Sequence, residues 1–180
     1  PYYSFLAIES LRQQLQHNNT PLKLQPLGTS KAKTTTVARE LKNSAKSPRL
    51  AQLLQRLCAS NQSHYIIELG TNLGLSTAYL ASNNTQSQIY TLEGQPELCQ
   101  IARQSFKQLH LNNIQIIEGN IDDTLPRLIQ QIPQIDLLFI DANHQYQATI
   151  NYYNLAKSKV HKNTIIVFDD IHWSEGMQQA

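Results

Sequence analysis

The sequence contains few cysteines and no long apolar run, and both absences exclude classes of protein. Cys58 and Cys99 are the only two cysteines in 180 residues, and they fit neither a C-x-x-C motif nor a zinc-binding spacing. We interpret both as buried apolar side chains, which argues against a disulfide-stapled fold and for a cytoplasmic protein. No apolar stretch approaches the ~20 residues of a membrane span, and the first residues lack the features of a secretory signal.

Charged residues are also scarce, at 16% of the chain, and they are unevenly distributed. Residues 1–60 carry nine Lys and Arg against two Glu, a net charge of +7, whereas residues 61–180 carry six against eleven acidic residues, a net charge of −5. A basic segment can steer an anionic partner such as a nucleic acid. Its positive residues are scattered, however, without the interleaved aromatics of a single-strand binding surface. We therefore favour a solvated helical surface.

Helices are expected in the first third of the chain. Apolar side chains recur at helical spacing over residues 5–15, and a turn at residues 21–28 separates them from the next helix. A further helix is expected to begin with Ser47 as N-cap and Pro48 at its first position. One face of this helix would carry four leucines, namely Leu50, Leu53, Leu54 and Leu57.

The apolar pattern changes at residue 64. Five short apolar runs follow, each succeeded by an amphipathic segment, which predicts a parallel sheet with helices on both faces. Short right-handed connections make this an α/β fold with a Rossmann-like, doubly wound parallel sheet of strand order 3-2-1-4-5. We expect residues 1–60 to form an N-terminal helical segment and residues 61–180 to form the Rossmann-like domain. The five runs are HYIIEL, QIYTLE, IQIIEG, IDLLFID and TIIVFDD.

Carboxylates end four of these five runs, at the edge where such sheets bind ligands. Solubility alone does not explain acidic residues at so many strand ends, so their concentration predicts a ligand-binding cleft. The third run ends in an asparagine instead, whose amide could meet the edge of a base. In chain order, the residues that close the runs are Glu68, Glu93, Gly119-Asn120, Asp141 and Asp169-Asp170.

The stretch ELGTNLGLST after the first run forms a glycine turn. Gly70 and Gly74 let the backbone approach a ligand closely, and Ser76 lies in the first turn of the next helix. Asn72 stands where a dinucleotide fingerprint requires its second glycine, so NAD is disfavoured, and no Lys-Ser/Thr pair marks a nucleoside-triphosphate loop. Glu93, 23 residues after Gly70, stands where a carboxylate can accept both ribose hydroxyls of a nucleoside.

In this order the motifs resemble those of the class I S-adenosylmethionine-dependent methyltransferases. ELGTNLGLST is similar to their first motif, TLEG to the second, EGNIDD to the third and FIDANH to the fourth, over about residues 64–176. Within the family, the pattern is most similar to small-molecule O-methyltransferases of the catechol and sugar type. The resemblance implies S-adenosylmethionine as the cofactor and a small molecule as the acceptor, methylated at oxygen.

The resemblance also implies roles for single residues and for whole segments. The family's sheet finishes with a sixth strand and an antiparallel seventh, which are absent here, so we expect a C-terminally truncated domain. In similar enzymes the front helices cover the cleft or pair two subunits into a homodimer. The implied cofactor contacts are Glu68, Gly70 and Gly74 for the methionine part, with Thr71 and Ser76 in the same turn, Glu93 for the ribose, Asn120 and Ile121 for the adenine, and Asp141 for the amine and the reaction centre.

A metal site is one interpretation of the acidic edge. Neighbouring strands lie about 4.8 Å apart, so Asp141 on the fourth strand and Asp169 and Asp170 on the fifth should converge. Three carboxylates repel one another unless a cation lies among them. Mg²⁺ suits an all-oxygen set of ligands, and it would lower the pKa of an acceptor hydroxyl and orient the oxyanion.

A general base is the alternative. His144 and His172 each follow a strand-end aspartate by two or three residues, and either could take the proton of an acceptor hydroxyl without a metal. Each could instead be a loop side chain bonded to a backbone carbonyl or to a nearby carboxylate. The catalytic candidates are Asp141, His144, Asp169 and His172, and the sequence leaves metal and base open.

Two rival functions belong to other classes. The chain could be an RNA-directed methyltransferase or nucleic-acid binder that uses its basic front segment. IDANH after the fourth strand lacks the Asn/Asp-Pro-Pro-aromatic stretch used on base amino groups, which argues against this rival. The chain could also be a nucleoside-binding module without catalysis.

Overall fold

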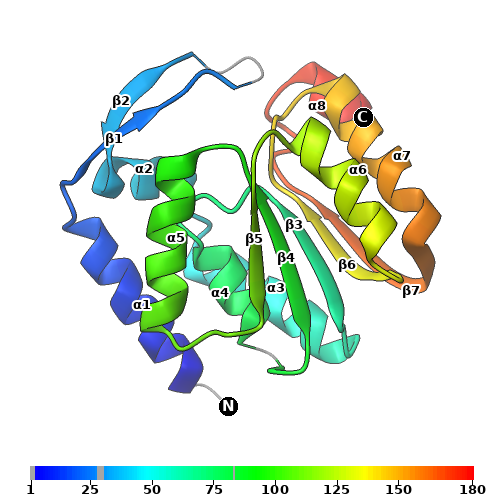
Figure 1. The fold of residues 1–180 in the computed structure, drawn as a ribbon, viewed down its shortest axis with the longest axis horizontal. Coiled ribbons are helices and arrows are strands. Elements are labelled where there is room, and N and C mark those ends of the chain that lie inside the picture. Colours follow the sequence, from blue (N-terminus) through cyan, green and yellow to red (C-terminus); the bar gives the residue numbers. More distant parts are fainter. Residues whose placement is uncertain (1–2, 28–30, 83) are drawn as a thin grey trace.

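A parallel sheet forms the centre of the computed structural model, which describes residues 3–27, 31–82 and 84–180. Figure 1 shows its strands in the order β5-β4-β3-β6-β7, all parallel. Counted along the five strand–helix units, this is the predicted order 3-2-1-4-5, and the Rossmann-like fold class is confirmed. The strands are β3 (Tyr65–Leu69), β4 (Gln88–Glu93), β5 (Ile114–Glu118), β6 (Ile135–Ile140) and β7 (Val160–Phe168).

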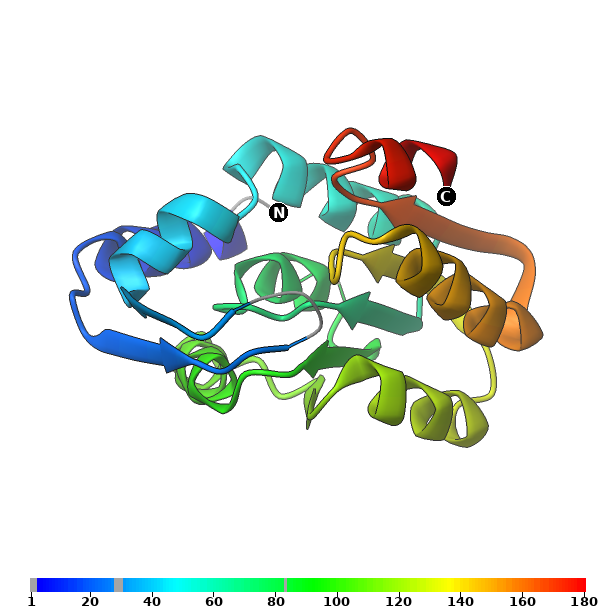
Figure 2. The same ribbon diagram turned by 90° about the horizontal axis from the view of Figure 1, so that it is seen from above.

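Helices cover both faces of the sheet because strand side chains alternate between the two sides (Figure 2). On β3, Ile66 packs in a cluster with α3 and α4, whereas Ile67 and Leu69 pack with α6 and α7 on the opposite face. All three side chains are fully buried. The helices that follow the strands are α4 (Leu75–Ala81), α5 (Pro96–Gln108), α6 (Ile121–Gln131), α7 (Tyr146–Ala156) with the 3₁₀ turn η1 (Lys157–Lys159), and α8 (Glu175–Gln179).

The N-terminal segment contains a hairpin in addition to its helices α1 (Tyr3–Gln16), α2 (Val37–Ser44) and α3 (Pro48–Ser60). Strands β1 (Pro21–Leu24) and β2 (Lys33–Thr36) pair antiparallel where the sequence predicted only a turn at residues 21–28. Residue 28 lies outside the described residues. The pattern is hard to recognise because each strand has four residues, and only Leu22 and Leu24 on β1 alternate into the core.

The predicted helix faces are confirmed for α1 and corrected for α3. Phe5, Ile8, Leu11 and Leu15 of α1 are buried, as their spacing predicts. Helix α3 begins at the predicted N-cap Ser47, but its Leu50 and Leu53 are 49% and 46% exposed. The buried stripe is Ala51, Leu54 and Cys58, because small side chains let α3 pack closely on α4. No helix among the described residues is long and apolar enough to cross a membrane.

Candidate functional site

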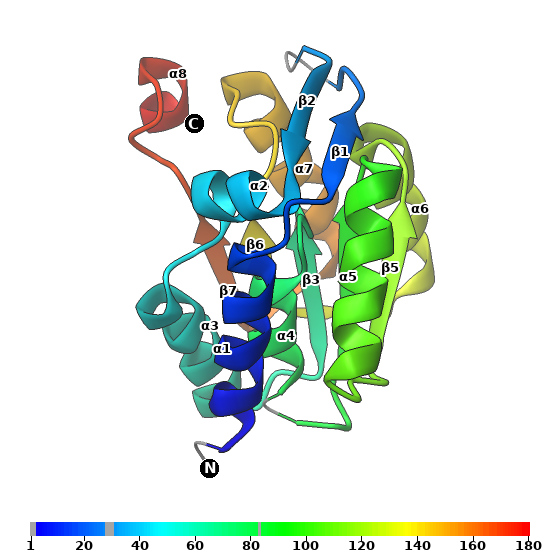
Figure 3. The same cartoon turned by 90° about the vertical axis from the view of Figure 1, so that its left-hand side faces the viewer.

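A cleft of ≈ 700 Å³ opens at the carboxyl ends of the strands. Figure 3 shows the β1–β2 hairpin and α2 lying above this end of the sheet. The cleft is lined by residues from the hairpin, from the segment between α2 and α3, and from the turns that follow β3, β4, β5, β6 and β7. Among the residues predicted from the sequence, its lining includes Gly70, Glu93, Asn120, Ile121, Asp141, His144 and Asp170.

The turn after β3 requires glycine at Gly70. Its φ is +100°, and a Cβ added there would lie 2.2 Å from the carbonyl oxygen of Asp141, so the backbone ends of β3 and β6 meet without room for a side chain. Gly74, with φ +83°, is close to the ring of Phe106, where an added Cβ would lie 2.7 Å from an aromatic carbon. Gly70 thus lets the end of β3 pack against the end of β6 at the edge of the cleft, whereas Gly74 lets α4 pack against α5.

The remaining predicted residues of this turn lie behind the cleft. Glu68 is fully buried and accepts hydrogen bonds from Thr91 Oγ1 (2.7 Å) and from the Thr77 hydroxyl. Burial raises the pKa of Glu68 to about 7, although bonds from Ser76, Thr77 and Thr91 oppose the shift. Thr71 is buried as well, with its hydroxyl 2.6 Å from that of Thr91. These side chains support the turn from the protein interior.

Glu93 ends β4 with both carboxylate oxygens fixed by backbone groups. Oε2 accepts from the N–H of Asn72 at 2.9 Å, and Oε1 accepts from the N–H of Gln95 at 2.9 Å. The residue is 8% exposed, and burial raises its pKa. The side chain of Gln95 in turn holds the hairpin, accepting from the N–H of Gln25 and donating to its carbonyl, both at 2.8 Å. The strand end and the hairpin are thus joined through one residue.

Asn120 and Ile121 form the part of the cleft that follows β5. Asn120 is the N-cap of α6, and its side-chain oxygen accepts from the N–H of Asp122 at 3.1 Å. Ile121 is the first residue of the helix. Asp122 and Asp123 occupy its first turn, where negative charge favours the helix dipole.

The strand-end aspartates Asp141 and Asp169 lie side by side with a lysine between them. The N–H of Asp141 bonds the carbonyl of Leu69, and that of Asp169 bonds the carbonyl of Ile140, so both residues continue the sheet register. Lys46 Nζ lies 3.1 Å from Asp141 Oδ1 and also forms an ion pair with Asp169 Oδ2. This contact could not be predicted from the sequence, where Lys46 is one of several scattered positive charges.

Lys46, Asp141 and Asp169 change one another's pKa values. Burial raises the pKa of Asp141 to about 8, with Lys46 opposing and Asp169 adding to the shift. For Asp169, burial acts in the same direction, but hydrogen bonding and attraction to Lys46 outweigh it and lower the pKa. Burial alone would lower the pKa of Lys46, yet the two carboxylates raise it. Lys46 thus favours the charged form of both carboxylates, whereas burial and the neighbouring Asp169 act against ionisation of Asp141.

His144 lies over the same edge. Its Nε2 is 3.9 Å from Asp141 Oδ1 and 3.6 Å from Asp170 Oδ2, and its ring lies 5.9 Å from that of Trp173 between centroids. One side-chain atom each of Asp141, His144 and Asp170 that could coordinate a metal lies within 4.8 Å of the other two. Asn143, His144 and Asp170 have φ of 64°, 35° and 51°, left-handed values that are uncommon for non-glycine residues, although Gln62 and His110 adopt them outside the cleft as well.

The other candidate base, His172, and the nearby aromatic residues Trp173 and Tyr146 are more exposed. His172 is an exposed residue of the segment after β7 and lies outside the lining of the cleft. Trp173 is 71% exposed and lines the cleft, whereas Tyr146, at 46% exposed, begins α7 outside the lining. Of the two histidines the sequence left open, the structure brings only His144 to the acidic edge.

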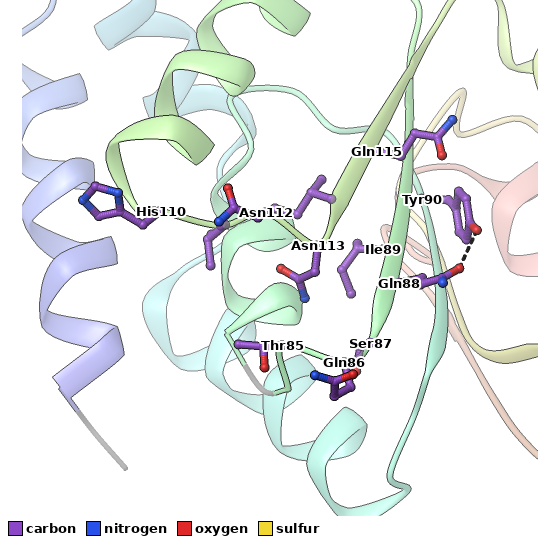
Figure 4. A pocket seen from close by; sticks show the side chains of 12 residues that line it. Thr85, Gln86, Ser87, Gln88, Ile89, Tyr90, His110, Asn112, Asn113 and Gln115 are labelled. Carbon is purple, nitrogen blue, oxygen red and sulfur yellow. Dashed lines mark hydrogen bonds between the residues drawn. The ribbon is translucent and has the colours of Figure 1, made fainter.

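A second cavity, of ≈ 590 Å³, lies at the opposite end of the sheet, where β4 and β5 begin (Figure 4). Its lining is rich in amide side chains, among them Gln88, Asn113 and Gln115, and the hydroxyl of Tyr90 donates to Gln88 at 2.8 Å. None of the residues predicted for the site belongs to it. The carboxyl-end cleft is therefore the candidate site.

The sequence model of one protein family, described as a methyltransferase domain, matches residues 67–171. The matched region covers more than half of the chain and runs from β3 to the segment after β7, so it contains the whole carboxyl edge. The chain belongs to this family of methyltransferase domains. The resemblance inferred from the four sequence motifs is thereby confirmed at the level of the family.

Particular relatives are O-methyltransferases. The catechol O-methyltransferase of Mycobacterium tuberculosis is 30% identical over 136 residues, which cover 74% of this chain and 60% of that protein. The solved structure of the O-methyltransferase TomG from Streptomyces achromogenes, in complex with SAM, matches with a TM-score of 0.66 at 23% identity, covering 74% of this chain and 65% of that one. An O-methyltransferase from Bacillus cereus, in complex with SAH, gives 0.69 at 20% identity, covering 98% and 76%.

The two structural likenesses show the fold alone, because their sequence identities are low. The chain spans 56% to 60% of the length of the first three curated relatives that it matches. What those longer proteins bind and methylate is therefore a starting point for proposals about this chain.

Proposed function

We propose that this domain binds S-adenosylmethionine and transfers its methyl group to a hydroxyl oxygen of a small molecule. The observation that carries the proposal is the convergence of Gly70, Glu93 and Asp141 on one cleft at the carboxyl ends of three neighbouring strands. Family membership and the catechol O-methyltransferase relative support the same reaction class. The cofactor would supply a methyl group made electrophilic by its sulfonium.

The residues of the cleft fit such a nucleoside ligand. A volume of ≈ 700 Å³ lies in the usual range for ligand pockets, about 300 to 1,000 Å³. Glu93 is a fixed, nearly buried acceptor for a pair of ribose hydroxyls. Asn120 and Ile121 offer an amide and an apolar side chain to an adenine, and Gly70 lines the cleft next to Asp141, where the methionine part would lie.

We assign the role of general base to His144. It lines the cleft, and Asp141 and Asp170 lie close enough to stabilise the imidazolium that forms when Nε2 takes the proton of an acceptor hydroxyl. His172 lies outside the lining. In this assignment Asp141 faces both the cofactor amine and the reaction centre, and Asp169 holds Lys46 beside it.

The predicted Mg²⁺ site stays a prediction, and we assign it no step. Asp141, Asp169 and Asp170 do lie at one edge, but the ammonium of Lys46 occupies the space between the first two carboxylates. As it stands, this donor set does not fit a divalent cation. A metal bound there would have to displace a buried ion pair.

We propose that residues 1–60 serve as a lid, because the β1–β2 hairpin and the segment carrying Lys46 both line the cleft. A homodimer is the alternative use of this segment. Analytical ultracentrifugation at micromolar concentration distinguishes a lid on a monomer from a subunit contact. The two free, buried cysteines, Cys58 and Cys99, support a cytoplasmic location of the enzyme.

Calorimetric titration with S-adenosylmethionine and S-adenosylhomocysteine tests the proposed function. Glu93→Gln should weaken binding about 10- to 100-fold, because a hydrogen bond to a charged group contributes about 1.5 to 3 kcal/mol. Glu118→Gln is the matched control, since Glu118 pairs in register with Glu93 on the next strand but is 38% exposed. Absence of binding by the folded wild-type protein at sub-millimolar concentration would refute the proposal.

A further inference from the structure

The edge between β6 and β7 already contains a cation that the chain itself supplies. Lys46 Nζ lies 3.1 Å from Asp141 Oδ1 and pairs with Asp169 Oδ2. The side chain of Lys46 is 16% exposed, and those of Asp141 and Asp169 are 14% and 23% exposed. Surface lysines are long and mobile, so an ammonium this enclosed needs something that holds it in place.

Two helix ends provide that support. The N–H of Ala45 bonds the carbonyl of Leu41 at 3.0 Å and closes the last turn of α2. The hydroxyl of Ser47 accepts from the N–H of Leu50 at 3.4 Å and begins α3. Lys46 is the single residue between these two caps, so its backbone position is set by both helices. Its side chain is directed at the aspartates by the fold of the N-terminal segment.

An ammonium and a divalent cation compete for the same space. Mg²⁺ needs oxygen ligands at about 2.0 to 2.1 Å in a near-octahedral arrangement. The oxygens of Asp141 and Asp169 instead contact one nitrogen, and a second cation beside it would be repelled. The repulsion between two neighbouring carboxylates, which would otherwise favour a metal, is already relieved by Lys46.

We propose that Lys46 takes the place of a divalent cation between Asp141 and Asp169. It is a positioning residue, which holds the two carboxylates beside the reaction centre and prevents a metal from binding between them. The inference rests on the proposed function only in locating the reaction at this edge of the cleft.

Electron paramagnetic resonance of Mn²⁺ provides the test, because the signal of free Mn²⁺ falls when the ion binds protein. Wild-type protein should leave the signal unchanged at sub-millimolar Mn²⁺. Lys46→Ala should bind Mn²⁺ at least tenfold more tightly, and adding Asp169→Asn should abolish that gain. Lys42→Ala is the matched control, since it removes the same charge from an exposed position on α2. It should behave as wild type.

Two results would overturn the inference. One is tight Mn²⁺ binding by wild-type protein that Lys46→Ala does not change; the other is a folded Lys46→Ala protein that gains no Mn²⁺ affinity. Lys46→Met, which keeps the apolar stem, provides a second folded variant if the alanine variant does not fold. Titration with S-adenosylhomocysteine on the same samples separates this outcome from the proposed function, because nucleoside binding at Glu93 does not depend on the cation.

Discussion

Glu68 allows the electrostatic reasoning to be tested directly. Its carboxyl group is fully buried, and burial raises its pKa from 4.5 to about 7. In the unfolded chain the group ionises at its ordinary pKa, so the folded state binds the proton more tightly. The stabilisation from this group is therefore complete below about pH 4.5 and is lost as the pH rises through about 7.

The perturbation is Glu68→Gln, which keeps the shape of the side chain and removes the ionisation. A shift of one pKa unit corresponds to about 1.4 kcal/mol. Between pH 5 and pH 8 the free energy of unfolding of the wild-type protein should therefore fall by about 2 to 3 kcal/mol, a loss that the variant does not show. Urea unfolding at both pH values measures the free energy of unfolding of each protein. From pH 5 to pH 8, the free energy of unfolding of wild type should fall by about 2 to 3 kcal/mol relative to that of Glu68→Gln.

The exposed Glu118→Gln variant is the control, and its difference from wild type should not change with pH. The stabilising bonds from Thr77 and Thr91 could make Glu68→Gln less stable at every pH, so the pH dependence is the quantity that decides. An equal difference between wild type and Glu68→Gln at pH 5 and pH 8 would refute the argument that burial dominates this site.

Two further predictions concern the backbone and the far end of the sheet. Gly70→Ala should lower the free energy of unfolding by at least about 2 kcal/mol in urea titration, because left-handed strain adds to the 2.2 Å overlap with Asp141; Gly176→Ala, which meets nothing closer than 3.5 Å, should change it little. Asp136→Ala should cost about 2 to 4 kcal/mol at pH 7, because Asp136 accepts from two backbone N–H groups and from the ring of His161. Although burial opposes it, this bonding lowers the pKa of Asp136, so the difference should diminish in acid unfolding as the pH falls below the usual range of an aspartate.

The sheet could be predicted from the sequence because its signal is local and repeated. Each strand is a short apolar run, and each run ends in polar residues at the same edge, as with Glu93 at the end of β4 and Asp141 directly after β6. Right-handed crossovers then leave few possible orders. The N-cap Ser47 was predictable for the same reason, since a cap depends on residues only a few positions apart.

The features that were missed depend on contacts between distant segments. The hairpin strand Pro21–Leu24 has only four residues and no distinctive β pattern. The residue after it, Gln25, is held by Gln95, which lies 70 positions further along the chain. Lys46 meets Asp141 and Asp169 only because two helices bring it across the cleft. The sequence also does not distinguish the role of Gly70, which packs against Asp141 at the cleft, from that of Gly74, which packs against Phe106. Such distinctions require the packed structure.

Gln95 connects the cleft to the hairpin by hydrogen bonds on both sides. The main chain of Gln95 is bound by Glu93, and its side chain is bound by both backbone groups of Gln25. A ligand bound at Glu93 and the hairpin above it are therefore connected through a single residue, Gln95. We therefore expect binding at Glu93 and the position of the hairpin to depend on each other.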